Sequence, residues 1–148
     1  MTVTIKPLAE RDFFAWYGLF SAYTESLGLE PTDEQTMRVW TALQGDEADG
    51  VLAVDTVAGT VGFAHFSVFS RLLQGDTGFA LEDVFVAPDM RQRGVATALI
   101  EHVRTRAEEE HRSVVRWVTR PEDVAAKALY ERFRATTGDW ALYDLNVG

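Results

Sequence analysis

The clearest pattern of apolar and polar residues lies in residues 81–109. Residues 84–87 form a short apolar run rich in β-formers, which indicates a buried strand. Pro88 and Asp89 end that run. Beyond Arg93 the apolar period changes to about 3.6 residues, so the pattern predicts a strand, a tight turn and an amphipathic helix. The apolar stripe of this helix consists of Val95, Leu99, Val103 and Ala107, flanked by Ala96 and Ile100.

The first half of the chain is predicted to hold two helices between strands. Gly28 ends the first helix, and Thr32 and Gln35 have the spacing of a capping box that opens the second. Residues 58–60 separate two runs of β-formers and read as a hairpin turn. The predicted elements are a strand at 3–8, helices at 10–27 and 32–43, strands at 51–57 and 61–69, and a loop at 70–78.

The last third of the chain predicts two further strands and a short helix. A strand over residues 113–119 follows the amphipathic helix, which implies a right-handed parallel crossover. Asp123 stands where an N-cap would begin a helix over residues 124–133. Residues 139–147 alternate apolar and polar positions, which predicts a final strand. Because no repeat or linker interrupts the pattern, we expect one α/β domain over residues 1–148.

Composition narrows the class of protein. The chain has 148 residues, 47 % of them apolar, which suits one domain with a sizeable core. The absence of cysteine excludes disulfides, thiolate metal sites and a cysteine nucleophile, and three scattered histidines make no metal signature. No stretch reaches the ~18–20 apolar residues of a membrane span and no signal peptide is visible, so we expect no membrane partner and a cytoplasmic location.

The formal net charge of −9 disfavours a nucleic-acid partner, since such proteins normally show a basic face. Two arginines at one turn of an acidic protein suggest a small positive site for an anionic cofactor. The negative surface would then attract a cationic substrate. Acidity that serves only solubility explains the net charge equally well. The acidic loop residues that could draw in a polyamine, or simply be solvated, are Asp46, Glu47, Asp49 and Asp76.

The turn between the strand at 84–87 and the amphipathic helix is a candidate phosphate site. The first backbone N–H groups of a helix lack internal partners and lie at the positive end of the helix dipole. Gly94 allows a ligand to approach the backbone closely, and Ala96 adds little bulk. The kinase-type loop GxxxxGK[ST] is absent, and Gly94 alone does not make the dinucleotide fingerprint GxGxxG.

The spacing Arg91-x-x-Gly94-x-Ala96 resembles the [QR]xxGx[GA] turn of the GNAT-type N-acetyltransferases. The resemblance extends over essentially the whole chain, because the predicted order of elements is that of the superfamily. Asp123, Ala126 and Tyr130 have the spacing of a second signature, N-x-x-A-x-x-x-Y, with Asp in place of Asn. Arg134 stands near where the family usually has a glycine. Residues 81–86, LEDVFV, look like the corresponding strand of the spermidine/spermine (diamine) N-acetyltransferases, and Trp117 and Trp140 also suit that branch.

This resemblance implies a GNAT fold and an acetyl-CoA cofactor. The fold would be a mixed, mostly antiparallel sheet, splayed at a bulged strand and covered by helices on both faces. The backbone at the splay would pair with the pantetheine arm, and the turn would hold the pyrophosphate, with a hydroxyl added by Thr97. The implied cofactor-binding residues are Val84, Phe85, Val86, Arg91, Gln92, Arg93, Gly94, Val95, Ala96, Thr97, Asp123 and Ala126.

The implied reaction is direct attack of an amine on the thioester in a ternary complex. The resemblance and the acidity of a phenol make Tyr130 the candidate acid for the departing thiolate. Glu82 is the candidate base, directly or through water, and could instead hold a cationic amine. Asp83 is the second candidate base, since on a regular strand it points away from Glu82. A backbone N–H near Val84 would stabilise the oxyanion. His65 is a possible proton shuttle or a structural residue, and we expect His102 and His111 at the surface.

The sequence thus predicts an N-acetyltransferase acting on a primary amine of a small cationic molecule. Acetylation of a protein N-terminus, a lysine or an antibiotic amine is an alternative activity. A catalytically degenerate acyl-CoA-binding sensor is a non-enzymatic alternative, which the departures at Asp123 and Arg134 keep open. By resemblance we also expect a homodimer, in which the final strand could pair or exchange.

Overall fold

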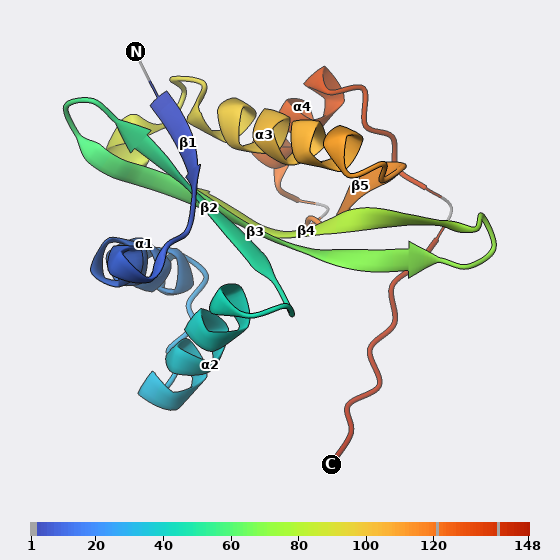
Figure 1. Cartoon of the computed structure of the whole chain (residues 1–148), viewed down its shortest axis with the longest axis horizontal. Coiled ribbons are helices and arrows are strands. Elements are labelled where there is room, and N and C mark those ends of the chain that lie inside the picture. The colour runs from blue at the N-terminus through green and yellow to red at the C-terminus, as the bar shows by residue number, and fades with distance from the viewer. Residues whose placement is uncertain (1–2, 121, 139) are drawn as a thin grey trace. The chain divides into compact units, whose positions relative to one another are not determined.

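The computed structural model describes residues 3–120, 122–138 and 140–148. The chain divides into two compact units, Met1–Val118 and Thr119–Gly148, which are described in turn. The first unit contains a five-stranded sheet in the order β1-β2-β3-β4-β5 (Figure 1). Its elements are β1 (Val3–Pro7), the 3-10 turn η1 (Glu10–Asp12), α1 (Phe13–Ser26), α2 (Asp33–Gln44), β2 (Asp49–Asp55), β3 (Gly59–Arg71), β4 (Asp76–Val86), the 3-10 turn η2 (Pro88–Met90), α3 (Val95–Glu109) and β5 (Val114–Trp117).

The sheet is mixed and mostly antiparallel, as predicted. Strands β1 to β4 form an antiparallel meander, and β5 pairs with β4 in parallel after the crossover through α3. The pairing of β4 with β5 covers only Gly78 to Leu81 of β4. Within the described residues, β4 beyond Leu81 therefore pairs with β3 alone, which is the predicted splay.

A β-bulge lies at the start of the splayed part of β4. His65 of β3 is opposite Asp83, and the next residue, Phe66, is opposite Leu81. Glu82 is thus an extra residue on β4 with no counterpart on β3, the arrangement that defines a bulge. The expectation of a bulged strand is confirmed.

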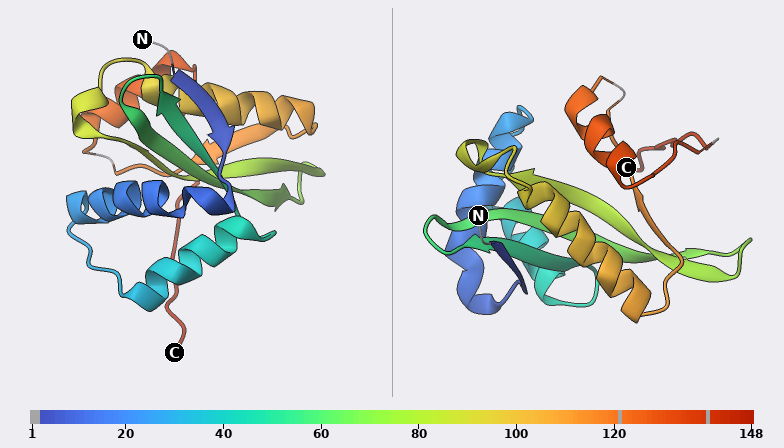
Figure 2. Two further views of the ribbon diagram at one scale, coloured as in Figure 1. Left: turned by 60° about the vertical axis from the view of Figure 1, so that its left-hand side comes forward. Right: turned by 90° about the horizontal axis from the view of Figure 1, so that it is seen from above.

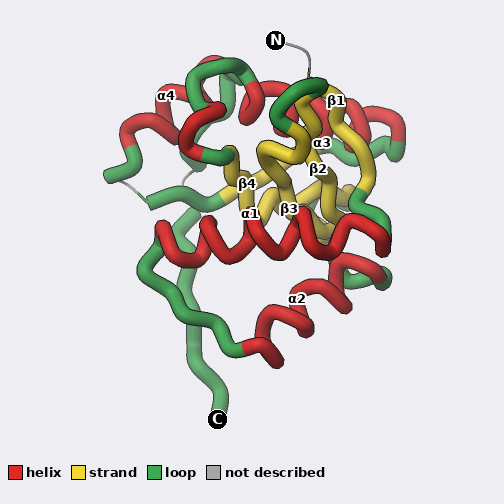
Figure 3. The backbone as a smooth tube through the Cα atoms, turned by 90° about the vertical axis from the view of Figure 1, so that its left-hand side faces the viewer, coloured by secondary structure: helices red, strands yellow, loops and turns green. Residues whose placement is uncertain are grey.

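Helices cover both faces of the sheet, and Figures 2 and 3 show α1 and α2 on one side of it with α3 on the other. The stripe predicted for α3 is buried at Val95, Leu99, Ile100 and Val103. The capping box of α2 is also present, since the backbone N–H of Gln35 donates to Thr32 at 3.1 Å. The core beneath α1 and α2 consists of Trp16, Phe20, Trp40, Leu43, Leu52, Phe63 and Phe85.

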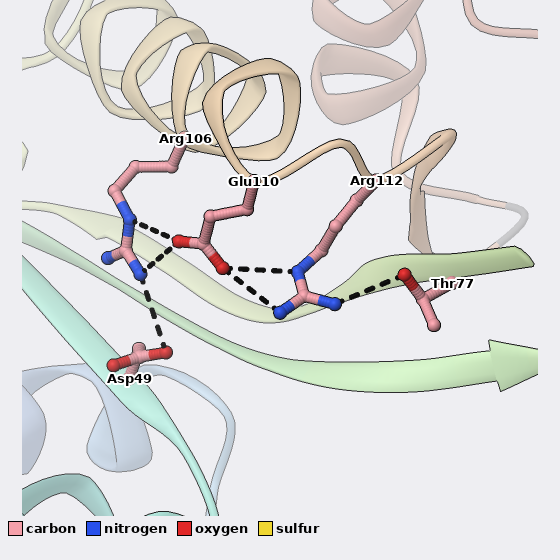
Figure 4. Close-up of polar contacts among 5 residues, drawn as sticks. All are labelled: Asp49, Thr77, Arg106, Glu110 and Arg112. Carbon is pink, nitrogen blue, oxygen red and sulfur yellow. Dashed lines mark hydrogen bonds and ion pairs between the residues drawn. The ribbon is translucent and has the colours of Figure 1, made fainter.

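The C-terminal end of α3 is attached to the sheet by two arginines (Figure 4). The guanidinium of Arg106 lies 5.3 Å from the ring centre of Phe66 and donates to Glu110 at 2.7 Å. Arg112 also donates to Glu110, at 3.0 Å, and reaches Thr77 of β4 at 3.1 Å. The shared carboxylate of Glu110 orients Arg106 over the ring of Phe66 and Arg112 over the ring of Phe79. The face of an aromatic ring is a favourable position for a cation. The attachment fixes the direction of α3 and hence the place of its N-terminus.

The β3–β4 hairpin is longer than predicted. The sequence assigned residues 70–78 to a loop, whereas β3 continues to Arg71 and β4 begins at Asp76. These two residues are direct cross-strand partners, and Arg71 donates to both carboxylate oxygens of Asp76 at 2.8 and 2.7 Å. The ion pair closes the hairpin where the polar sequence suggested an open loop.

In the second unit, the predicted helix is present and the predicted final strand is not. Helix α4 (Val124–Arg132) begins at Asp123, which caps it by accepting from the backbone N–H of Ala126 at 3.0 Å. Residues 140–148 contain no strand. Alternating residues form a strand only when a neighbouring strand satisfies their backbone groups, and this segment has no such pairing among the described residues. Its apolar side chains Trp140, Leu142, Tyr143, Leu145 and Val147 are exposed.

No helix among the described residues has both the length and the apolar character that crossing a membrane requires.

Gly62 allows β3, β4 and α3 to approach closely. A Cβ at this position would lie 2.8 Å from the carbonyl oxygen of Phe85 and 3.4 Å from side-chain atoms of Val95 and Leu99. We therefore expect Gly62→Ala to lower the free energy of unfolding by about 1–3 kcal/mol, as measured by urea denaturation.

Gly18→Ala is the matched control for this substitution. Gly18 lies within α1, and a Cβ there would meet nothing within 4 Å. Alanine should raise the stability at this position by up to about 1 kcal/mol, because it is the better helix former. A Gly62→Ala protein as stable as the parent would contradict the assigned packing.

Candidate functional site

The turn that joins β4 to α3 has the backbone shape of an anion site. Gln92 and Gly94 both adopt left-handed backbone conformations, with φ of 62° and 83°. Turns of this kind can aim successive N–H groups at a common point, and the first N–H groups of α3 add to them. A Cβ on Gly94 would meet no atom within 4 Å, so the space beside the turn is open. The turn can therefore receive a phosphate-like anion against its backbone.

Some side chains of the turn contact the rest of the protein, and others are exposed to solvent. Arg91 donates through Nε to the carbonyl of Val86 at 3.0 Å, and its guanidinium lies 5.6 Å from the ring centre of Phe85. This arginine joins the turn to the end of β4 and keeps a positive charge there. Val95 is buried, so its side chain packs in the core. Of the other predicted residues, Gln92, Arg93 and Gly94 are exposed, and Ala96 and Thr97 are half-buried in the first turn of α3.

The splayed part of β4 leads directly into this turn. Val84, Phe85 and Val86 pair with β3 on one edge, opposite Ala64, Phe63 and Gly62 respectively. On the other edge, β5 ends opposite Leu81. An extended ligand can pair with such an edge through backbone hydrogen bonds while the strand's side chains remain packed.

The bulge places two consecutive carboxylates on the same face of β4. Ser67 donates to Glu82 at 3.3 Å, and the ring of His65 contacts Asp83 at 3.0 Å. His65 and Ser67 are two residues apart on β3 and so share a face. The expectation that Asp83 points away from Glu82 is therefore wrong, because the strand is not regular at this point.

Asp83 belongs to a hydrogen-bonded group that links α1, β3 and β4. The indole N–H of Trp16 donates to Nε2 of His65 at 3.0 Å, and Tyr23 donates its hydroxyl to Asp83 at 2.6 Å. Since an indole nitrogen only donates, Nε2 of His65 carries no proton and Nδ1 donates to Asp83. His65 is thus held as a neutral donor, which favours the structural interpretation over that of a proton shuttle.

This environment keeps Asp83 ionised. Burial by itself would raise the pKa of the carboxyl, but the hydrogen bonds from His65 and Tyr23 outweigh burial and hold the pKa below its ordinary value. A carboxylate with a lowered pKa is a weak base. Glu82, which is exposed, is the better placed of the two to exchange protons with water.

The other acidic and basic residues singled out in the sequence lie elsewhere. Asp49 and Asp76 are engaged with Arg106 and Arg71, whereas Asp46 and Glu47 are exposed in the loop before β2. His111 is exposed, but His102 is half-buried on α3, where burial and then Arg106 lower its pKa. Among the described residues, no group of three or more His, Asp or Glu side chains could hold a metal ion.

The remaining predicted site residues share α4 in the second unit. Burial raises the pKa of Tyr130, and the charge of Asp123 raises it further, against a hydrogen bond with Thr119. The phenol therefore stays protonated at neutral pH, as an acid must. Arg134, at the expected glycine position, has a φ of 60°, so the left-handed turn that a glycine would favour is kept.

Sequence reasoning missed the roles of Trp16 and Tyr23. They lie 49 and 60 residues from their partners His65 and Asp83, respectively. The only local signal was their position on an aromatic-rich helix, which equally indicates core packing.

Comparison with known proteins places the chain in a family. The model of the acetyltransferase (GNAT) family matches residues 10–134. The D-amino-acid N-acetyltransferase HPA3 of Saccharomyces cerevisiae is 28% identical to this chain over 159 residues, which cover 97% of the chain and 91% of the yeast protein.

Solved structures agree with the family match. A ribosomal-protein-alanine N-acetyltransferase from Brucella melitensis has a TM-score of 0.82 at 25% identity, over 99% of this chain and 100% of that protein. AAC(6')-Iy, solved with a bisubstrate analog of CoA and acetylneamine, has a TM-score of 0.82 at 20% identity over 100% of both chains, a likeness of fold alone. The family model matches residues 10–134, and the splayed strand β4 leads into a turn that can bind an anion. This chain therefore belongs to the GNAT acetyltransferase family and is an acyltransferase.

Proposed function

We propose that this protein transfers the acetyl group of acetyl-CoA to a primary amine of a small cationic molecule. The observation that carries the proposal is the splayed strand β4. Two carboxylates lie on one face of this strand, and they are followed by an open backbone edge and by a turn that can bind an anion. The family match supports acetyl transfer, and GNAT enzymes use acetyl-CoA. The cofactor of this chain and the class of its acceptor are parts of the proposal.

The residues present fit a coenzyme A molecule. The open space beside Gly94 and the N-terminus of α3 suit the pyrophosphate, with Arg91 and Arg93 adding positive charge and Thr97 a hydroxyl. The free edge of β4 suits the amide groups of the pantetheine arm. In this proposal the cofactor-binding residues of the first unit are Val84, Phe85, Val86, Arg91, Gln92, Arg93, Gly94, Val95, Ala96 and Thr97. Asp123 and Ala126, which belong to the second unit, stay a prediction from the family resemblance.

Bound acetyl-CoA supplies an activated acetyl thioester. An amine with a pKa of about 10 is mostly protonated at neutral pH, so it must lose a proton before it can attack. Glu82 accepts this proton, directly or through water. A backbone N–H near Val84 donates to the acetyl oxygen as negative charge develops there. The amine nitrogen would bond to the acetyl carbon, the carbon–sulfur bond of the thioester would break, and Tyr130 would donate its proton to the departing sulfur.

The acidic environment favours a cationic acceptor. Glu82 and Asp83 lie on one face at the bulge, and the whole chain carries a formal net charge of −9. Residues 81–86 also resemble the strand of the diamine acetyltransferases, which makes a diamine the first acceptor to test. The similar proteins are named for D-amino-acid and ribosomal-protein-alanine acetylation, and one structure of the same fold was solved with an acetylneamine analog, so those acceptors are the alternatives.

The experiment that tests the function measures CoA release from acetyl-CoA with polyamines, amino acids, aminoglycosides and peptides, and weighs each product by mass spectrometry. A diamine that gains one acetyl group supports the proposal. Acetylation of only an aminoglycoside or a peptide keeps the reaction and overturns the acceptor class. Acetyl-CoA binding without release of CoA on any amine favours the degenerate sensor.

Glu82→Gln should lose most of the acetyl-transfer activity, and full activity of this variant across pH would overturn the role of Glu82 as base.

We also propose a homodimer. Residues 140–148 expose a series of apolar side chains on an extended segment without strand pairing, which a second copy could cover by adding a strand. Sedimentation equilibrium of the intact chain gives the oligomeric state, and a monomer at micromolar concentration would overturn this part of the proposal.

Charge at the turn should control CoA affinity. Gly94→Asp and Gly94→Asn have nearly the same size, and both residues tolerate the left-handed conformation of Gly94. The Asp protein should bind CoA at least about tenfold more weakly than the Asn protein, about 1.4 kcal/mol, because its carboxylate faces the pyrophosphate. Titration calorimetry measures both constants, and equal affinities would contradict the placement of the pyrophosphate.

Loss of the Tyr130 hydroxyl should affect turnover and not cofactor affinity. We expect Tyr130→Phe to lower kcat by about 100-fold, the usual contribution of general acid catalysis, while the CoA dissociation constant stays the same. Tyr17→Phe makes the same chemical change on α1, at a side chain that is 40% exposed, and serves as the control. Unchanged turnover in Tyr130→Phe would remove the residue from the mechanism.

A further inference from the structure

We infer that Asp83 determines acceptor specificity, as a fixed negative charge that selects amines bearing a second positive charge and disfavours amines bearing a carboxylate. The inference rests on the proposed acetyl transfer and assigns to Asp83 a task that differs from proton acceptance by Glu82.

The position of Asp83 brings its charge to the acceptor side of β4. The bulge at Glu82 places both carboxylates on one face, at the point where β5 has ended. Each carboxylate oxygen of Asp83 accepts one hydrogen bond, from Tyr23 at 2.6 Å and from His65 at 3.0 Å. The side chain is still 29% exposed, and each oxygen has a second lone pair. The carboxylate is thus rigidly held and remains open to a ligand.

The partners of Asp83 leave its charge uncompensated. Trp16 donates to Nε2 of His65 at 3.0 Å, so His65 is neutral and can offer only the proton on Nδ1. The hydroxyl of Tyr23 is also neutral. The four side chains together therefore carry one negative charge, and it lies on the member that reaches solvent. His65 is only 4% exposed, which protects this arrangement from water.

The protonation state agrees with a fixed charge. The donors that hold the pKa of Asp83 below its ordinary value keep it ionised throughout the neutral range. Such a carboxylate gains little by taking a proton from an amine, and it attracts a cation at every pH at which the attacking amine can be neutral. Proton acceptance is left to Glu82, which is exposed and bonded only to Ser67 in the described contacts.

This division of tasks predicts the form of the acceptor. The attacking nitrogen must be neutral and so gains little from Asp83. A second nitrogen that stays protonated gains the full attraction, whereas a carboxylate on the acceptor is repelled. The chain should therefore differ in specificity from its relative named for D-amino acids.

The test uses three acceptors of equal chain length and different charge: 1,4-diaminobutane, 1-aminobutane and 4-aminobutanoate. We expect kcat/KM of the wild-type protein to fall in that order. Asp83→Asn keeps the shape of the side chain, because its amide can accept from His65 and donate to the Tyr23 oxygen. In this variant the ratio of kcat/KM for the diamine to kcat/KM for the monoamine should fall by about tenfold or more. The ratio of kcat/KM for 4-aminobutanoate to kcat/KM for 1-aminobutane should rise.

Two further variants separate charge from structure. Tyr23→Phe removes the hydroxyl that donates to Asp83 and keeps the carboxylate, so the order of the three acceptors should persist. Glu25→Gln removes a negative charge from an exposed position on α1 and should leave both ratios unchanged. An Asp83→Asn protein with the wild-type ratios, or with all three acceptors reduced equally, would overturn the inference.

Binding of the three acceptors, measured by NMR titration in the presence of CoA, distinguishes this inference from the proposed function. If none of the three acceptors is acetylated, the proposed transfer to a small cationic amine of this kind fails. In that case, charge selection is still supported if the wild-type protein binds the diamine more tightly than the monoamine and the Asp83→Asn variant does not. Equal binding of the diamine and the monoamine by the wild-type protein overturns it.

Discussion

The extra residue in β4 is the constraint on which the rest of the candidate site depends. Glu82 has no counterpart on β3, so the strand changes its alternation at that point. Two consecutive carboxylates then share a face, and pairing with β5 ends at the residue before them. The free edge of β4 and the acidic face are consequences of the same irregularity, which is why a proposed cofactor and a proposed acceptor can meet there.

The elements packed on either face of the sheet each contribute to this strand. Helix α3 is attached at its C-terminal end by Arg106 and Arg112, so its N-terminus and the open turn at Gly94 follow the end of β4. Helix α1 contributes Trp16 and Tyr23, which orient the partners of the carboxylate on β4. Buried polar groups stabilise one arrangement strongly when all of their hydrogen bonds are made. None of the described buried side-chain polar atoms lacks a partner.

Proteins similar to this chain are named for different acceptors, a D-amino acid in one case and a ribosomal-protein alanine in another. A scaffold that serves several acceptors does not identify one, because function resides in the side chains placed on it. For this chain the inferred specificity rests on the carboxylates at the bulge and the donors around Asp83. In the proposed function, specificity follows from charge and geometry at one point of β4, and the turn before α3 holds the cofactor.

Patterns within a few residues of each other were sufficient to predict the elements that frame the site. The stripe of α3, the capping box at Thr32 and the turn at Gly94 depend on contacts between near neighbours, and all three are present. The hairpin length was mispredicted, because the Arg71–Asp76 pair forms only when two strands align. The strand predicted at residues 139–147 is absent from the described part of that range, residues 140–147, for a related reason, since alternation provides no partner for its backbone.

The amino-acid sequence by itself therefore determined the family, the order of the elements and the location of the anion-ready turn. Only the tertiary structure decided which way Asp83 faces and what holds it. A single unpaired residue reverses the side of the sheet on which a strand's side chains lie, and the family resemblance implied a bulge without showing that it falls at Glu82. The partners of His65 and Asp83 on α1 lie 49 and 60 residues away, so their contacts exist only once the helix packs on the sheet.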